Sequence, residues 1–125
     1  MNIILIGGAQ TTYFLAREFL SQGHQVTLIN RDPEDSRIMY QKLKATVLLG
    51  EGSDPETLEQ AGARSADVLI AIAGEYGTLS EIAYGNIYGK KVIGLGTWEI
   101  KGVVKAGSPE EAVELALHEF KTINR

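Results

Sequence analysis

The sequence of 125 residues has the composition of one soluble globular domain, with 44% hydrophobic and 22% charged residues and a formal net charge of −4. It contains no cysteine, which excludes disulfides, thiol nucleophiles and Cys-based zinc sites. The negative charge argues against nonspecific nucleic-acid binding, which needs a basic face, and no apolar run approaches the roughly 20 residues that span a bilayer. We therefore expect a cytoplasmic protein with neither nucleic-acid nor membrane partners.

Apolar runs and helical segments alternate along the whole chain. Strands are expected at 2–6, 26–29, 46–49, 68–72, 91–95 and 103–104. Helices are expected at 11–22, from 33, from 55 to about 61, at 78–88 and from 109. Strict alternation with short turns predicts an α/β fold, a single doubly wound Rossmann-like three-layer sandwich over residues 1–125 with parallel sheet order 3-2-1-4-5-6.

Several helix ends carry recognisable capping residues. Asp32 and Asp54 are each followed by proline, the pattern of an N-cap with proline at the first helical position. Ser108 and Glu111 form the pattern of a capping box at the start of the last helix, and Gly23 can end the first helix in a left-handed cap. These signals place the helix boundaries independently of the apolar pattern.

The first candidate site is the turn that follows the first strand and opens the first helix. Backbone N–H groups and the positive end of a helix converge there on an anion, which suits a pyrophosphate cradle. Against the dinucleotide fingerprint G-x-G-x-x-G, Gly7 matches, Ala9 replaces the second glycine and Thr12 the third. A tight turn that binds nothing is the alternative. The candidate binding residues are Gly7, Gly8, Ala9, Gln10, Thr11 and Thr12.

Three more candidates follow the second and third strands. Asn30 stands at the tip of the second strand, where dinucleotide folds place an acid that accepts from the ribose hydroxyls. Arg31 can meet a ribose phosphate, or it is a solvated side chain at a helix start. Glu51 can accept from an adenine amino group, or it is a solvated turn carboxylate. The two histidines, His24 and His118, have no companions placed for a metal site, so no metal is expected.

The fourth expected strand ends in a Gly-rich turn that opens another helix. Gly74 and Gly77 allow a sharp turn, and Gly77 and Thr78 would present free N–H groups to a second anion. The alternative is purely structural, because Thr78-x-x-Glu81 is a capping box.

Up to about Gly74 the chain resembles the nucleotide-binding regulatory domain of bacterial potassium-transport systems, known as the KTN or RCK N-lobe. This resemblance covers about sixty per cent of the sequence and is carried by residues 3–9, 13–16, 23–29, 32–34, 50–62 and 66–71. It implies that NAD(H) or an adenine nucleotide binds as a ligand, not as a reactant, and that occupancy is coupled to channel gating. The chain departs from the family at Ala9, Asn30 and Glu51, where the family has glycine, an acid and aspartate.

Beyond Gly74 the chain resembles the LOG, or lysine-decarboxylase-like, phosphoribohydrolase superfamily. Residues 74–81 are similar to the signature G-G-x-G-T-x-x-E, with Glu75 in place of the second glycine, and 89–98 and 108–113 are similar to one branch. The resemblance implies a nucleotide phosphate at the turn and assistance by Glu81 in cleaving an N-glycosidic bond. The half of that family that supplies an arginine for hydrolysis is absent.

The two resemblances lead to the hypothesis of an engineered chimera, with a KTN-like half at 1–73 and a LOG-like half at 74–125. The leading interpretation is a noncatalytic nucleotide-binding domain for NAD or another adenine nucleotide, held at the carboxyl ends of the first and fourth strands. The alternatives are a nucleoside-monophosphate phosphoribohydrolase that uses Glu81 and a folded scaffold that binds nothing. A homodimer is a further candidate assembly.

Overall fold

The structure is a computed structural model that describes residues 1–7, 9–51, 54–72, 91–95 and 103–123, with the backbone alone for residue 9 and residues 119–123. The strands are β1 (Asn2–Ile6), β2 (Gln25–Asn30), β3 (Thr46–Leu49), β4 (Val68–Ile72), β5 (Lys91–Leu95) and β6 (Val103–Ala106). The helices are α1 (Ala9–Ser21), α2 (Pro33–Lys42), α3 (Pro55–Gln60), the 3-10 turn η1 (Ala63–Ser65) and α5 (Pro109–Ile123). The helix expected at 78–88 lies outside the described residues.

The six described strands form one sheet in the order β3-β2-β1-β4-β5-β6, and every neighbouring pair is parallel. This confirms the predicted fold class and strand order. The strand order changes direction at β1, because β1 pairs with β2 on one side and with β4 on the other. The chain leaves β1 in one direction along the sheet and returns to the other side of it at β4, the arrangement that places ligand crevices in doubly wound folds.

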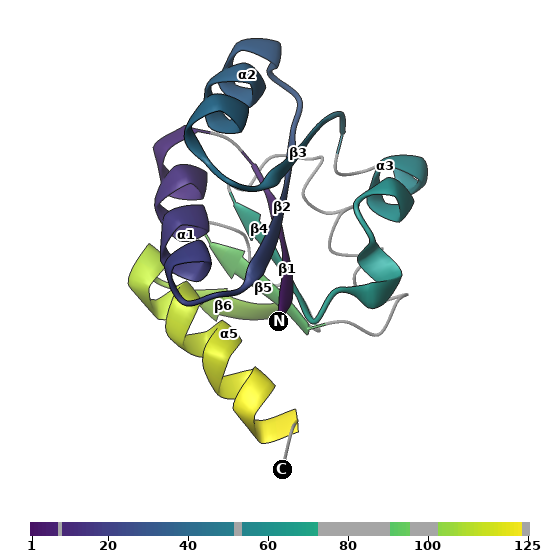
Figure 1. The fold of residues 1–125 in the computed structure, drawn as a ribbon. Coiled ribbons are helices and arrows are strands. Elements are labelled where there is room, and N and C mark those ends of the chain that lie inside the picture. Colours follow the sequence, from purple (N-terminus) through teal and green to yellow (C-terminus); the bar gives the residue numbers. More distant parts are fainter. Residues whose placement is uncertain (8, 52–53, 73–90, 96–102, 124–125) are drawn as a thin grey trace.

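Helices cover both faces of the sheet, as Figure 1 shows, with α1, α2 and α5 on one face and α3 on the other. The alternation of side chains along β1 explains this, since Ile3 and Leu5 join the larger core cluster while Ile4 and Ile6 join the smaller one. The larger cluster contains Leu15, Phe19 and Met39 from the helices on its side, together with Val113. The smaller contains Leu58, Ala63 and Ala66.

The predicted caps are confirmed at three helix starts. The Asp32 carboxylate accepts from the N–H groups of Glu34 (2.9 Å) and Asp35 (3.4 Å), and Asp54 accepts from the N–H of Glu56 at 3.1 Å. At α5 the Ser108 hydroxyl accepts from the N–H of Glu111 at 3.1 Å. The Glu111 carboxylate accepts from the N–H of Gly107 at 3.0 Å, one residue before the position that an ideal capping box uses.

Several boundaries differ from the expectation, and β2 is one residue longer at each end than the expected 26–29. α1 begins at Ala9, two residues before the expected 11, because the glycine turn after β1 leads almost directly into the helix. β6 extends to Ala106, and the single turn η1 between α3 and β4 was not expected from the sequence. Gly23 has a φ of +85°, which confirms the left-handed end of the first helix. Within the described ranges, no helix has both the length and the apolarity needed to cross a membrane.

Candidate functional site

Gly7 lies where the ends of three strands meet. Its N–H donates to the carbonyl oxygen of Ile29 in β2 at 3.2 Å, and its φ of +146° strongly favours glycine. A Cβ at Gly7 would lie 2.9 Å from the Cβ of Ile72, the last residue of β4, and 3.3 Å from the Ile72 carbonyl oxygen. The turn after β1 therefore depends on the absence of a side chain at this residue.

The start of α1 faces this turn without an acidic residue. The first turn of the helix contains no Asp or Glu, with Gln10 exposed and Thr11 half-buried. Thr12, at the third fingerprint position, is fully buried, and its Oγ1 would lie 3.5 Å from a Cβ on Gly7. Because the first N–H groups of a helix lack partners within the helix, an anion at this corner would meet both free donors and the positive end of the dipole.

Asn30 ends β2 beside this corner, and its side chain is turned into the protein. The residue is only 5% exposed, and its Oδ1 accepts from the N–H of Asp32 at 2.9 Å. Its Nδ2 is buried and has no hydrogen-bond partner in the described part of the chain. The orientation of the amide is chemically determined, because only the oxygen can accept from the Asp32 N–H.

Arg31 and Glu51 lie at the surface, at the ends of β2 and β3. Their nearest charged atoms, Nη1 of Arg31 and Oε2 of Glu51, are 4.0 Å apart, and the side chains are 60% and 57% exposed. Such an exposed pair contributes little to stability, roughly 0–1 kcal/mol. The two side chains lie near each other at the end of β2, where Asn30 also lies.

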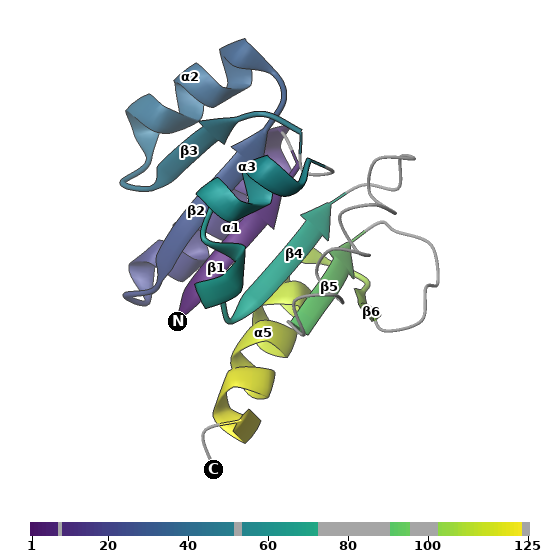
Figure 2. The ribbon, with the colours of Figure 1, turned by 90° about the vertical axis from the view of Figure 1, so that its right-hand side faces the viewer.

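The structure gathers one group of the expected site residues at the carboxyl edge of the sheet. Figure 2 shows the arrowheads of β1, β2 and β4 pointing toward the same edge. Gly7 and the start of α1 occupy its centre, and the side chains that follow β2 and β3 flank it. The expected residues Gly8, Gly74, Gly77, Thr78 and Glu81 lie outside the described residues, as does the side chain of Ala9.

Two residues at this edge were not expected from the sequence. Ile72 leaves no room for a side chain at Gly7. Asp32 caps its helix and also donates its backbone N–H to the Asn30 oxygen. The second contact had a sequence signal, because Asn commonly accepts from the backbone N–H two residues later in an Asx turn. The first had none, since Ile72 is distant in sequence and is brought to Gly7 only by the pairing of β1 with β4.

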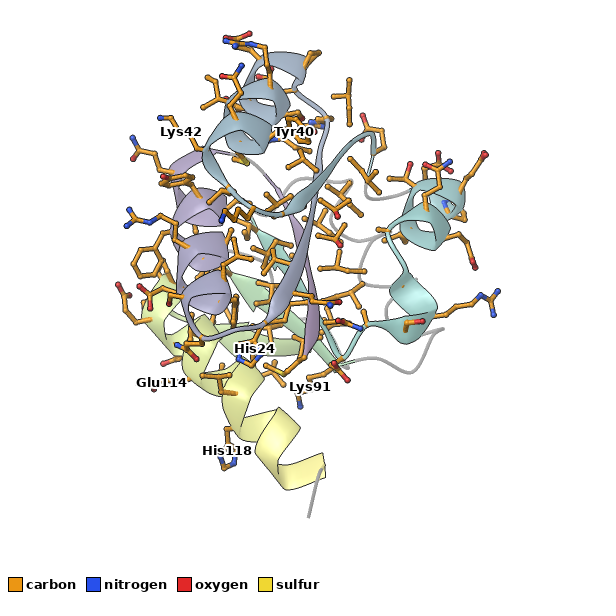
Figure 3. The ribbon with its side chains drawn as sticks, viewed as in Figure 1. His24, Tyr40, Lys42, Lys91, Glu114 and His118 are labelled. Atoms are coloured by element: carbon orange, nitrogen blue, oxygen red, sulfur yellow. The ribbon has the colours of Figure 1, made fainter. Side chains whose placement is uncertain are left out.

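His24 lies away from this edge. Figure 3 shows His24 and His118 toward the end of the molecule where β1 begins. The amino group of Met1 is 3.0 Å from Nδ1 of His24, so the ring nitrogen acts as the acceptor. Burial, and then the positive charge of the Met1 amino group, lower the pKa of His24, while Asp67 opposes them. Among the described residues, no group of three His, Asp or Glu side chains could hold a metal ion.

The fold and the glycine turn define the class of protein: a doubly wound α/β domain of Rossmann type with its switch point at β1 and β4. The sequence profile of the TrkA-N domain matches residues 3–115. Because this match covers most of the chain, the chain belongs to the TrkA-N domain family.

Curated relatives agree with this assignment over part of the chain. The Trk system potassium uptake protein TrkA homolog of Methanothermobacter thermautotrophicus is 36% identical over 74 residues, which are 59% of this chain and 34% of the relative. TrkA of Vibrio alginolyticus is 31% identical over 72 residues, 58% of this chain and 16% of the relative. The matched part thus spans about a third or less of these relatives.

Solved structures share the fold at low sequence identity. The TrkA-N domain of the inner membrane protein ybaL from Escherichia coli superposes with a TM-score of 0.74 at 14% identity and covers 95% of both chains. The GsuK channel bound to NAD superposes with a TM-score of 0.68 at 17% identity, over 92% of this chain and 20% of that one.

Proposed function

We propose that this chain is a noncatalytic regulatory domain that binds NAD(H) or another adenine nucleotide at the carboxyl ends of β1, β2 and β4. The observation that carries the proposal is the Gly7 turn, in which β1 ends against Ile72 and leads into a helix start without acidic side chains. The pyrophosphate of the ligand lies over this turn, where the N–H groups of the first turn of α1 point. Two structures of similar fold support this ligand class, the GsuK channel bound to NAD and the Shewanella denitrificans Kef CTD in its AMP-bound form.

The proposed ligand contacts follow the geometry of the edge. Residues 7–12 hold the pyrophosphate, and Asn30, Arg31 and Glu51 face the adenosine side, because they end the strands on that side of β1. Gly74, Gly77 and Thr78 follow β4 in sequence and form a second anion site across the switch point.

The partners of the domain follow from the potassium uptake proteins that it resembles. Nucleotide occupancy of this domain regulates potassium uptake, the process after which these relatives are named. The assembly that we propose is a homodimer. Residues 1–125 act as a single Rossmann-like domain, since all the described strands belong to one sheet.

The composite origin is a further part of the proposal. The pairwise matches of 72 to 74 residues agree with the length of the KTN-like half, whereas the TrkA-N profile extends across both halves to residue 115. A natural protein that carries both the KTN-like pattern and the LOG-like signature of residues 74–81 would contradict an engineered junction.

Thermal unfolding with and without NAD⁺, NADH, ATP and AMP tests nucleotide binding. A ligand at 100 times its dissociation constant stabilises the chain by about 2.7 kcal/mol, which raises the midpoint by several degrees for a protein of this size. No rise with any of the four nucleotides at millimolar concentration would overturn the proposal.

The variant Gln10→Glu tests where the phosphates lie. Gln10 is exposed in the first turn of α1, so a carboxylate there is compatible with the helix dipole and repels a nearby pyrophosphate. We expect the dissociation constant to rise about tenfold while the stability without ligand is kept. The matched control Gln22→Glu adds the same charge just beyond the far end of the same helix and should leave affinity unchanged. Equal effects of both variants would contradict a cradle at α1.

A further inference from the structure

We infer that Asn30 and Arg31 select a nucleotide that is phosphorylated on its adenosine ribose, so that the site prefers NADP(H) to NAD(H). The inference rests on the proposed function and names the ligand class more narrowly. Two features carry the inference. The amide of Asn30 offers the ligand a donor where an acid would offer an acceptor, and the positively charged Arg31 follows it in sequence.

The amide nitrogen of Asn30 is the donor that a ligand can satisfy. Its Oδ1 is occupied by the N–H of Asp32 at 2.9 Å, and its Nδ2 is buried without a partner in the described part of the chain. Leaving a buried polar group without a partner costs about 1–3 kcal/mol. A ligand oxygen that accepts from Nδ2 removes this penalty, so the structure favours a ligand with an acceptor at this place.

A phosphate on the ribose is a better acceptor here than a ribose hydroxyl. In dinucleotide folds the acid at the end of the second strand accepts from the 2′-hydroxyl, and its negative charge disfavours a 2′-phosphate. Asn30 has no charge, so it does not repel a 2′-phosphate, and its Oδ1 already accepts from the N–H of Asp32. A hydrogen bond from Nδ2 to an ionised phosphate oxygen is roughly twice as strong as one to a neutral oxygen.

Arg31 supplies the charge that such a phosphate requires. Its side chain is 60% exposed at the same strand end, and the guanidinium group presents donors in a fork that suits phosphate oxygens. The contact with Glu51 at 4.0 Å is long and solvated, so a dianionic phosphate can replace it at small cost.

Two other acidic groups at this corner already have partners. The Asp32 carboxylate accepts from two N–H groups of its own helix, and Glu34 pairs with Arg37. Asp35 is exposed in the first turn of α2. Glu51 contacts Arg31, so its carboxylate has to move aside for a phosphate.

Calorimetric titration of the chain with NADP⁺ and with NAD⁺ tests the inference. We expect NADP⁺ to bind at least about tenfold more tightly. Asn30→Asp keeps the shape of the side chain and replaces the Nδ2 donor with a carboxylate oxygen, so it should reverse the preference. Arg31→Ala should bring the two dissociation constants close together, whereas Arg37→Ala, an exposed arginine on α2, should leave their ratio unchanged.

The outcomes separate this inference from the proposed function. If NAD⁺ binds as tightly as NADP⁺ or more tightly, the ribose-phosphate preference is wrong while nucleotide binding stands. If neither dinucleotide binds, the ribose-phosphate preference is wrong, and the thermal unfolding with ATP and AMP decides whether the proposed function stands. If Asn30→Asp does not fold, the exposed pair of variants at Arg31 and Arg37 decides, and an unchanged NADP⁺ to NAD⁺ ratio in Arg31→Ala overturns the role of the arginine.

Discussion

The starts of α1 and α2 lie side by side at one edge of the sheet and are built in opposite ways. At α2 the Asp32 carboxylate accepts from two backbone N–H groups, Pro33 removes a third donor, and Glu34 and Asp35 place negative charge in the first turn. At α1 the first turn contains no acid, and the helix follows the Gly7 turn almost at once.

On the proposed function, this difference lets one edge hold a ligand and remain stable. The start of α2 satisfies its own donors and dipole from within the chain, so its N–H groups are not offered to a phosphate. In the proposed function, the start of α1 offers its donors and positive end to the pyrophosphate. A phosphate near α2 must instead be met by side chains, which is the role proposed for Asn30 and Arg31.

The largest change in the free energy of unfolding is expected when a side chain is added at Gly7. Gly7→Ala should lower the free energy of unfolding by about 3 kcal/mol, since the new Cβ would lie 2.9 Å from Ile72 Cβ and the φ of +146° is unfavourable for alanine. Urea unfolding measures the change. Gly23→Ala is the matched control, because its φ is +85° and nothing lies within 4 Å of a new Cβ, so it should cost about 1 kcal/mol. Equal losses would mean that contact with Ile72 does not constrain the turn.

A smaller effect is expected at the start of α2. Asp32→Ala removes the acceptor of two N–H groups and should lower the free energy of unfolding by about 1 kcal/mol. Asp35→Ala removes a charge from the same first turn without removing the cap, and should cost less, about 0.5 kcal/mol. If both changes lower the free energy of unfolding equally, negative charge in the first turn stabilises the start of α2 and the cap adds nothing.

The smallest effect concerns the opposite end of α1, where His24 follows the helix. Because the pKa of His24 is lowered in the folded chain, the unfolded chain binds the proton first as the pH falls below about 6.5. The free energy of unfolding should therefore decrease from that pH down to the lowered pKa. His24→Gln should remove this part of the pH dependence in urea unfolding at a series of pH values, and His118→Gln on α5 should retain it. A slope that persists in His24→Gln would assign it to other groups.

Much of the fold was predictable because the signals are local. The apolar runs and the prolines after Asp32 and Asp54 depend on neighbouring residues alone, and the observed strands and caps agree with them. The strand order was predictable because short, right-handed connections leave few arrangements for such an alternation. The start of α1 was placed two residues late, since the degraded fingerprint gives no capping side chain to mark it.

The sequence by itself determined the alternation of elements, the helix caps and the position of the glycine turn after the first strand. Only the tertiary structure decided what that turn and its neighbours can do. The pairing of β1 with β4 brings Ile72 against Gly7, and packing around the end of β2 buries the Asn30 amide, so that Nδ2 has no partner among the described residues. Whether a polar group is occupied or available depends on distances between atoms, and those are set when distant segments pack together.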